Sequence, residues 1–373
     1  MRAYLDHASS SPVRPEVREA LAQFLELPQA DPGRPYEEAI TIRRLIEDAR
    51  GSVAGLAGVT PRQVVFTSSI AESINHAVTV LGDAGTILTT GAERTSVLEA
   101  ARAAGNLDLL HLDAAGHLDL EELEARLVSG PISLVCAQVA NHETGVLGET
   151  RHVVELAHQH GAHVHLDATI GFGRLPLDFQ SLDADAVTVS SELLGGPQGA
   201  SALIVRKGSI LKPLLLGGAQ ERARRAGLEN LLGMIGFGVA AEVLGQPGAM
   251  EHEAQHQRAL LDRLCETATA VSGVQAVGEQ DPRRQAGWLR CFTIEGVEAE
   301  GVVMGLDRAG ISVHSGSACS AEALEPSAVL SAMGIEADRS LRLSVGWSST
   351  TEDVERFEAN FGPVIERLRS LRS

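Results

Sequence analysis

The sequence has 373 residues, of which 44% are hydrophobic, and it carries a formal net charge of −18. A chain of this size can bury one large core and a second, smaller one, and its negative charge argues against a surface that binds nucleic acid or an anionic membrane. Residues 1–7 contain no apolar targeting segment and no apolar run approaches the length of a membrane span, so we expect a cytoplasmic protein that does not bind membranes.

Strand-like and helix-like segments alternate from residue 63 to residue 205. Short β-branched runs bounded by turn residues favour strands, and apolar residues at helical spacing favour helices between them. This alternation predicts an α/β fold with a mostly parallel sheet between helices, and ligand groups at the carboxyl ends of the strands. The expected strands are 63–67, 86–89, 107–112, 134–139, 163–167, 186–189 and 200–205, and the expected helices are 71–81, 95–104, 119–128 and 153–160.

A smaller α+β domain is expected after residues 246–248 (QPG), which interrupt a long helical region. We therefore predict a large α/β domain over residues 12–245 and a small domain over 246–373, with residues 1–11 packed against the small one. The segments expected in the small domain are strands 288–294, 311–314 and 341–345, and helices 299–309 and 351–371.

Several short motifs follow one another along nearly the whole chain. They are residues 4–8 (YLDHA), 66–73 (FTSSIAES), 141–145 (NHETG), 165–169 (HLDAT), 190–199 (SSELLGGPQG) and 315–319 (SGSAC) with 324–327 (LEPS). In their order and spacing they resemble the motifs of the cysteine desulfurases, class V aminotransferase-like enzymes that use pyridoxal phosphate. The resemblance implies a fold-type I transferase fold, with a large and a small domain, and a homodimer.

Four residues match functional positions of the family. The resemblance implies that Asp167 pairs with the pyridinium nitrogen of the cofactor and that Ser190 contacts its phosphate. It implies that Arg342 holds the substrate carboxylate, and that Cys319 is the nucleophile that takes sulfur as a persulfide. A loop cysteine needs only partial exposure and some thiolate to attack sulfur, and such chemistry does not require the family's cofactor lysine.

The family's cofactor lysine is missing. The chain has only two lysines, Lys207 and Lys212, and Leu193 stands where the family has the lysine that forms the Schiff base. Leucine can neither form an imine nor carry a proton. Glu192 replaces the neighbouring histidine, and its carboxylate would repel a phosphate. Other replaced positions are Ala71 and Leu228 for two phosphate-binding threonines, Arg94 for the ring-stacking histidine, His142 for an asparagine and Ile170 for a glutamine.

We therefore expect no covalently bound cofactor, and three functions remain open. The leading hypothesis is a degenerate cysteine desulfurase homologue that acts as a persulfide carrier or regulatory partner through Cys319, together with a sulfur-donor or sulfur-acceptor protein. The second is an enzyme in which Arg94, His142, Asp167 and Glu192 form a remodelled pocket for another small ligand. The third is an active desulfurase that uses Lys207 or Lys212.

Each of these positions also has a structural interpretation. Leu193 is expected to fill the core next to Leu194, Asp167 can accept backbone hydrogen bonds at its strand end, and Arg342 can pair with a surface carboxylate. His163, His165 and Asp167 share one strand face, a set that could ligate a metal. We expect no metal there, because the matching family motif binds none. The four cysteines are not spaced as C-x-x-C, so they predict neither disulfides nor a zinc site.

Overall fold

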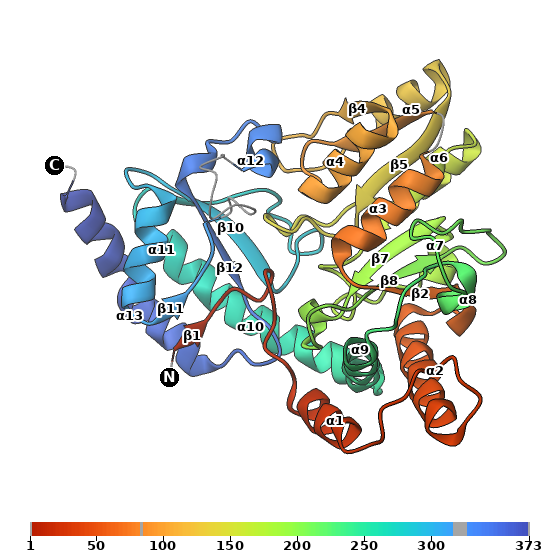
Figure 1. Cartoon of the computed structure of the whole chain (residues 1–373). Coiled ribbons are helices and arrows are strands. Elements are labelled where there is room, and N and C mark those ends of the chain that lie inside the picture. Colours follow the sequence, from red (N-terminus) through yellow and green to blue (C-terminus); the bar gives the residue numbers. More distant parts are fainter. Residues whose placement is uncertain (1, 83–84, 316–326, 372–373) are drawn as a thin grey trace.

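The computed structural model describes residues 2–82, 85–315 and 327–371 (Figure 1). Its central feature is a seven-stranded sheet in the order β2-β8-β7-β6-β5-β3-β4. Only β8 runs against its neighbours, so the sheet is mostly parallel, as predicted. The strands are β2 (Val64–Thr67), β3 (Thr86–Thr90), β4 (Asn106–Leu110), β5 (Ile132–Gln138), β6 (His163–Asp167), β7 (Ala186–Ser190) and β8 (Ser201–Val205).

Helices cover both faces of this sheet. α3 (Ile70–Leu81) and α4 (Thr95–Ala104) pack with β3 and β5 on one face. α2 (Glu37–Ala57), α5 (Leu120–Ser129), α6 (Thr150–Gln159) and α9 (Leu231–Gly245) contribute to the apolar core on the other face. The strands β7 and β8 are buried along their whole length, because both of their faces are covered.

A second core forms around a three-stranded antiparallel sheet in the order β12-β10-β9. Its strands are β9 (Val274–Ala276), β10 (Leu289–Ile294) and β12 (Ser340–Ser344), and it is packed by α10 (Ala249–Thr269), α11 (Ala299–Arg308) and α13 (Thr351–Ser370). The N-terminal strand β1 (Ala3–Tyr4) pairs in parallel with β11 (Ile311–Ser312), so the start of the chain joins its C-terminal part.

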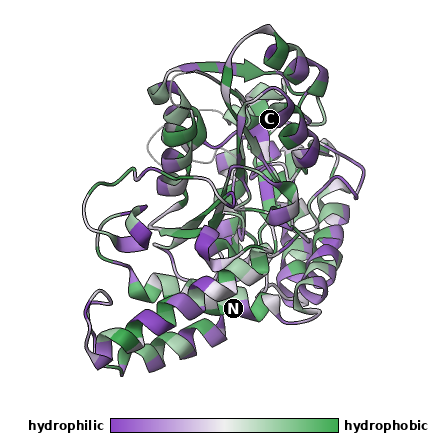
Figure 2. Ribbon diagram, turned by 90° about the vertical axis from the view of Figure 1, so that its right-hand side faces the viewer, coloured by the Kyte–Doolittle hydropathy of each residue, from purple (hydrophilic) through white to green (hydrophobic). Residues whose placement is uncertain are grey.

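The remaining elements are short or peripheral. They are α1 (Pro15–Leu25), α7 (Phe179–Leu182), α8 (Gln220–Ala223) and α12 (Ala328–Ala332), and the 3-10 turns η1 (Pro61–Gln63), η2 (Glu192–Leu194) and η3 (Ala337–Arg339). Most helices carry hydrophilic and hydrophobic residues in alternation along the ribbon, as expected for helices with one buried side (Figure 2).

The predicted α/β class is confirmed, and most expected segments agree with the structure. The helix 95–104 and the strand 163–167 have the bounds that the sequence predicted. The strand expected over 311–314 is shorter, because it ends at Ser312 and His314 forms only an isolated bridge with Arg342. The sequence analysis did not identify α1 or α2.

Within the described ranges, no single helix is long and apolar enough to cross a membrane. Two consecutive helices, Leu231–Gly245 and Ala249–Thr269, are together long and apolar enough to span a membrane, but the chain bends by 84° between them. Much of the first helix of this pair is buried in the core of the large sheet.

Candidate functional site

Asp167 ends β6 at the carboxyl edge of the large sheet and is only 5% exposed. Its Oδ1 accepts hydrogen bonds from the backbone N–H of Thr169 at 2.9 Å and from the Thr169 hydroxyl at 2.6 Å. Its Oδ2 accepts a bond from Nε of Arg94 at 2.7 Å. Burial acts to raise the pKa of Asp167, but the Arg94 charge and the Thr169 bonds together hold it below its ordinary value. The carboxylate is therefore satisfied by this chain's own groups.

Arg94 reaches this position from the residue that precedes α4. A second guanidinium nitrogen donates to the Thr169 hydroxyl at 2.9 Å, so the arginine is held at two points. Its side chain is 20% exposed. An ion pair that is buried to this degree is screened less by solvent than a surface pair. In the family, the position of Arg94 holds a histidine that stacks on the cofactor ring. Here this position holds a cation, and the cation binds Asp167, the residue expected to pair with the ring nitrogen.

The loop after β7 places Leu193 in an apolar environment. Leu193 is 3% exposed and belongs to the core cluster that contains Ala8, Ala140 and Ile170. Leu194 is also buried, but it belongs to the core of the large sheet. The prediction of core filling is therefore right for both leucines, although they fill different cores. The Leu193 backbone carbonyl accepts a bond from Arg174 at 3.0 Å.

Ser190 and Glu192 lie at the same sheet edge. Ser190 is the last residue of β7 and is 1% exposed. Glu192 begins the turn η2 and is half-buried. Burial raises the pKa of Glu192, and its own backbone N–H, the Ser190 hydroxyl and Arg94 oppose that rise. A carboxyl group therefore stands beside the serine that the family resemblance assigns to the cofactor phosphate.

His142 and Arg342 lie together on the side of the second core. A guanidinium nitrogen of Arg342 donates to the His142 carbonyl at 3.0 Å. Burial is the main cause that lowers the pKa of His142 well below its ordinary value, and the positive charge of Arg94 adds to it. The ring is therefore neutral. Within the described part of the chain, the buried Nδ1 of His142 has no hydrogen-bond partner.

Arg342 is bound by the N-terminal segment. It donates to Oδ1 of Asp6 at 2.8 Å and to the Ser9 hydroxyl at 2.5 Å, and it is 2% exposed. The pairing with a carboxylate that the structural interpretation allowed does occur, but it is buried and not at the surface. A substrate carboxylate at this arginine would have to compete with Asp6.

The first turn of α3 contains a carboxylate, Glu72, that binds the loop before the helix. Oε2 of Glu72 accepts a bond from the backbone N–H of Ser68 at 2.8 Å. Arg225 then binds the same carboxylate, with Nε at 2.8 Å from Oε1. Burial acts to raise the pKa of Glu72, but Arg225 and Ser68 hold it below its ordinary value. The N-terminus of a helix attracts anions, and here a carboxylate of the same chain binds the N–H of the residue before the N-cap Ser69.

The other predicted site positions are more dispersed. Cys319 lies outside the described residues. Leu228 is 78% exposed. His163 binds Asp185, whereas His165 contacts the Thr188 hydroxyl, so these two histidines do not converge on Asp167. Among the residues that the structure describes, no group of three or more His, Cys, Asp or Glu is arranged to hold a metal.

Glu93, a buried carboxyl group next to Arg94, was not among the predicted site residues. It is 3% exposed, and burial raises its pKa to about 8, with Asp167 adding to the rise and Arg94 opposing it. The pairs Asp6–Arg342 and Glu72–Arg225 were not predicted either. Each pair joins residues more than 150 positions apart, and single-sequence patterns carry no signal for such distances.

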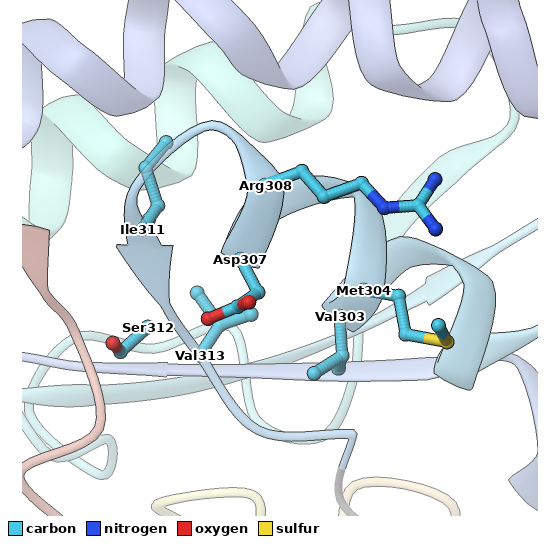
Figure 3. A pocket seen from close by; sticks show the side chains of 7 residues that line it. All are labelled: Val303, Met304, Asp307, Arg308, Ile311, Ser312 and Val313. Carbon is cyan, nitrogen blue, oxygen red and sulfur yellow. The ribbon is translucent and has the colours of Figure 1, made fainter.

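A separate hollow of about 300 Å³ lies against α11 and β11 (Figure 3). Its lining includes Val303, Met304 and Ile311, with Asp307 and Arg308 at its side. Asp307 already pairs with Arg2. None of the predicted site residues lines this hollow, so it adds nothing to the site around Asp167.

The sequence profile of the family described as Aminotransferase class-V matches residues 3–357. The chain belongs to this family. Among relatives of this class V aminotransferase homologue, cysteine desulfurase IscS 1 of Archaeoglobus fulgidus is 34% identical over 380 residues, which cover 99% of this chain and 98% of the relative. A cysteine desulfurase of Klebsiella pneumoniae is 33% identical over 381 residues, which cover 99% of this chain and 94% of the relative.

Solved structures agree with this family assignment. A NifS-like protein from Rickettsia africae has a TM-score of 0.90 and 28% identity, over 98% of this chain and 100% of its own. The expected family and fold are thereby confirmed.

Pyridoxal phosphate, the cofactor implied by the family, does not fit the groups present here. Its ring nitrogen needs the Asp167 carboxylate, whose Oδ2 is bound by Arg94, and its phosphate would lie near Glu192. The loop offers no lysine, since Leu193 is part of an apolar core. We derive no reaction step through this cofactor.

Proposed function

We propose that this protein is a cysteine desulfurase homologue that has lost pyridoxal phosphate chemistry and retains a role in sulfur transfer. The observation that carries the proposal is the Arg94–Asp167 ion pair. A pyridinium can approach Asp167 only if this pair opens, and separating a buried pair leaves an uncompensated charge that costs about 3–5 kcal/mol. The binding energy of a cofactor would first have to offset that cost.

The two lysines do not offer a substitute for the missing one. Lys207 follows β8, which runs antiparallel to β7 with Val205 opposite Ala186. It therefore lies beyond the amino end of β7, whereas Ser190 and the cofactor loop lie at the carboxyl end. Lys212 is exposed, and its carbonyl accepts a bond from His76 on α3. An active desulfurase that uses either lysine is the third hypothesis, and we rank it last.

The sulfur-transfer role rests on Cys319 and its sequence motif. In the proposed step the Cys319 thiolate attacks the outer sulfur of a donor persulfide, R–S–SH. A sulfur–sulfur bond forms on Cys319, the donor sulfur–sulfur bond breaks, and R–S⁻ leaves. The exchange is redox-neutral and needs no cofactor, so it is compatible with the loss of the lysine. The donor is an active desulfurase or a small persulfide, and the acceptor is a thiol protein.

A second candidate function is binding of another small polar ligand in the remodelled pocket. It is favoured by the buried Nδ1 of His142 and Nε of Arg342, which have no hydrogen-bond partner within the described ranges. A ligand that bonds to both groups would have to tolerate the neighbouring charges of Arg94 and Asp6.

Three further expectations remain proposals. We propose that the chain forms a homodimer, functions in the cytoplasm, and binds neither nucleic acid nor membranes. The negative charge of −18 supports the last of these. Exposed leucines in one stretch of the chain, Leu215, Leu216, Leu228 and Leu232, support a contact between subunits.

The loss of cofactor chemistry can be tested with the purified protein and pyridoxal phosphate. We expect no absorption from a lysine-linked cofactor, and no pyridoxyl group on Lys207 or Lys212 after borohydride reduction. Leu193→Lys alone should bind the cofactor poorly, because Arg94 still holds Asp167, whereas Leu193→Lys with Arg94→His should bind it better. A reduced adduct on a native lysine would refute the proposal.

The sulfur-transfer role has its own test. Incubated with an active desulfurase and cysteine, the wild-type chain should gain one sulfur atom at Cys319, as measured by peptide mass spectrometry. Cys319→Ser should gain none, and buried Cys136, which is 2% exposed, should remain unlabelled in both proteins. Equal labelling of wild type and Cys319→Ser would leave the remodelled pocket as the better proposal.

A further inference from the structure

A mostly apolar cavity of about 50 Å³ with a few polar groups lies beside the Asp167 site without sharing its groups. It is lined by residues at the end of β3, at the end of β5, and at the start of α6. Neither Arg94, Asp167 nor His142 lines it. Its volume suits a few water molecules or a ligand of a few non-hydrogen atoms.

The cavity occupies the place where the sheet's topology favours ligands. From β3 the chain continues through α4 to the outer strand β4, and it then returns through α5 to β5 on the other side of β3. The connections thus leave β3 and β5 in opposite directions, which opens a crevice outside their carboxyl ends. Thr90 ends β3 and Gln138 ends β5, and both line the cavity.

Two buried polar groups in this lining lack partners. Oε2 of Glu93 and Oγ1 of Thr90 have no hydrogen-bond partner within the part of the chain that the structure describes. Glu93 is 3% exposed and Thr90 is 6% exposed, so bulk water does not satisfy them. A buried polar group without a hydrogen-bond partner destabilises the fold, and a bound molecule that supplies the partner removes that cost.

The lining offers acidic groups and no unpaired basic one, so a cation can bind there if Glu93 gives up its proton. Its lining contains the carboxyl groups of Glu93 and Glu149 and no arginine or lysine. His117 in the lining is already paired with Glu279. Glu149 lies at the more exposed end and is bound by Arg284, so Glu93 is the acceptor that remains for a ligand. The amide oxygen of Asn141 does not offer a second acceptor to the ligand, because it already accepts three hydrogen bonds from residues 143 and 144.

We propose that this cavity binds a small organic cation, an ammonium head group of a few non-hydrogen atoms, between the Glu93 carboxylate and the Thr90 hydroxyl. The ammonium donates to Oε2 of Glu93 and to Oγ1 of Thr90, and its carbon substituent lies against the apolar part of the lining, formed by Leu112, Leu118, Val146 and Val153. The site is independent of the sulfur-transfer role, because it uses no residue of that site.

Binding of a cation changes the protonation state of Glu93. Burial raises the pKa of this carboxyl to about 8, with Asp167 as the second cause and Arg94 opposing, and the Cys136 thiol is a further titratable neighbour. Without a ligand Glu93 is therefore largely protonated at neutral pH. A bound ammonium stabilises the carboxylate, so binding releases a proton.

The test is calorimetric titration of the full chain with methylammonium, with methanol as the neutral probe of similar size. We expect millimolar binding of methylammonium, as suits a ligand with so few atoms, and no measurable binding of methanol. Glu93→Gln should weaken methylammonium binding at least tenfold. Glu99→Gln, a matched control at an exposed acid on α4, should leave it unchanged.

Thr90→Val keeps the shape of its side chain and should weaken binding severalfold even if Glu93→Gln proves unstable. Wild-type titrations in two buffers of different ionisation enthalpy should also report proton release. Absence of binding at about 50 mM methylammonium, or equal affinities in wild type, Glu93→Gln and Thr90→Val, would overturn the proposal, since a ligand of this size can bind at millimolar concentrations.

Discussion

At the residue scale, three buried or half-buried ion pairs near the candidate site join residues from distant parts of the sequence. Arg94 binds Asp167, Asp6 binds Arg342, and Arg225 binds Glu72. Burial acts to raise the pKa of Asp167 and of Glu72, and the paired arginine helps to hold each pKa below its ordinary value. In each case a group that the family resemblance assigns to a ligand, or to a ligand-binding turn, contacts a side chain of the same protein.

Breaking the Arg94–Asp167 pair should destabilise the fold. Arg94→Met leaves the Asp167 carboxylate buried without its cation, and we expect a loss of about 3 kcal/mol in the free energy of unfolding, measured by urea denaturation. Arg102→Met is the matched control, because Arg102 forms an exposed pair with Glu99 on the same helix. It should cost less than about 1 kcal/mol. Equal effects of the two substitutions would contradict a buried, stabilising pair.

The same pair predicts a pH dependence. The pKa of Asp167 is lowered in the folded chain, so its ionised form adds stability above its unfolded value of about 3.9. That contribution is lost as the pH falls below about 4 and through the folded pKa. Asp167→Asn should therefore be less stable than wild type at neutral pH, and this difference should shrink in urea titrations at about pH 3.

Glu93 should respond to pH in the opposite sense. Its pKa is raised to about 8, so the folded chain holds this proton while the unfolded chain has lost it above about pH 4.3. Stability therefore falls as the pH rises between these values. Glu93→Gln resembles the protonated form and should match wild type at about pH 4. At about pH 8.5 it should be more stable by several kcal/mol, because a shift from about 4.3 to about 8 corresponds to at most about 5 kcal/mol. Identical pH profiles for the two proteins would contradict this assignment.

At the element scale, α2 and α9 approach closely because α9 carries glycines where they meet. A Cβ added at Gly238 would lie 2.3 Å from the Cα of Ala49, a backbone atom that cannot easily move. A Cβ added at Gly245, at the end of the same helix, would meet nothing within 4 Å. The same type of residue is therefore required at one position and replaceable at the other.

This difference gives a matched pair of substitutions. Gly238→Ala should lower the free energy of unfolding by about 1–3 kcal/mol through overpacking, although alanine is the better helix former. Gly245→Ala should be neutral or stabilising, by up to about 1 kcal/mol. Thermal or urea unfolding of the two variants decides the matter, and a stabilised Gly238→Ala would show that the two helices can separate without cost.

At the scale of the whole molecule, the exposed leucines predict self-association. Leu216 and Leu228 are 84% and 78% exposed. Large apolar side chains that are exposed to this degree and lie near one another in the sequence are typical of a surface that another subunit covers. We expect light scattering to give twice the 39.3 kDa mass of one chain. Leu216→Glu with Leu228→Glu should shift the protein toward the monomer, whereas Val128→Glu, at another exposed apolar residue of 69% exposure, should not. A monomeric wild type would contradict the proposed homodimer.

The sequence by itself determined the family, the α/β class and the main elements. Alternating segments of strand and helix period carry this information locally, and the bounds of α4 and β6 follow directly from it. The absence of the lysine was equally a fact of the sequence, because Leu193 stands in a motif that can be aligned without a structure. The long helix α2 was not predicted. Its apolar residues form the face that packs against α9, and this partner is known only from the structure.

Only the tertiary structure decided where the charged groups find their partners. Arg94 was identified as a replaced position, but its bond to Asp167 depends on the carboxyl ends of β3 and β6 lying at the same sheet edge. Burial of Glu93 and the cavity beside it depend on β5 lying next to β3, and on the start of α6 closing that edge. Charge compensation and desolvation act between residues that are close in space, so they become visible only when the chain has folded.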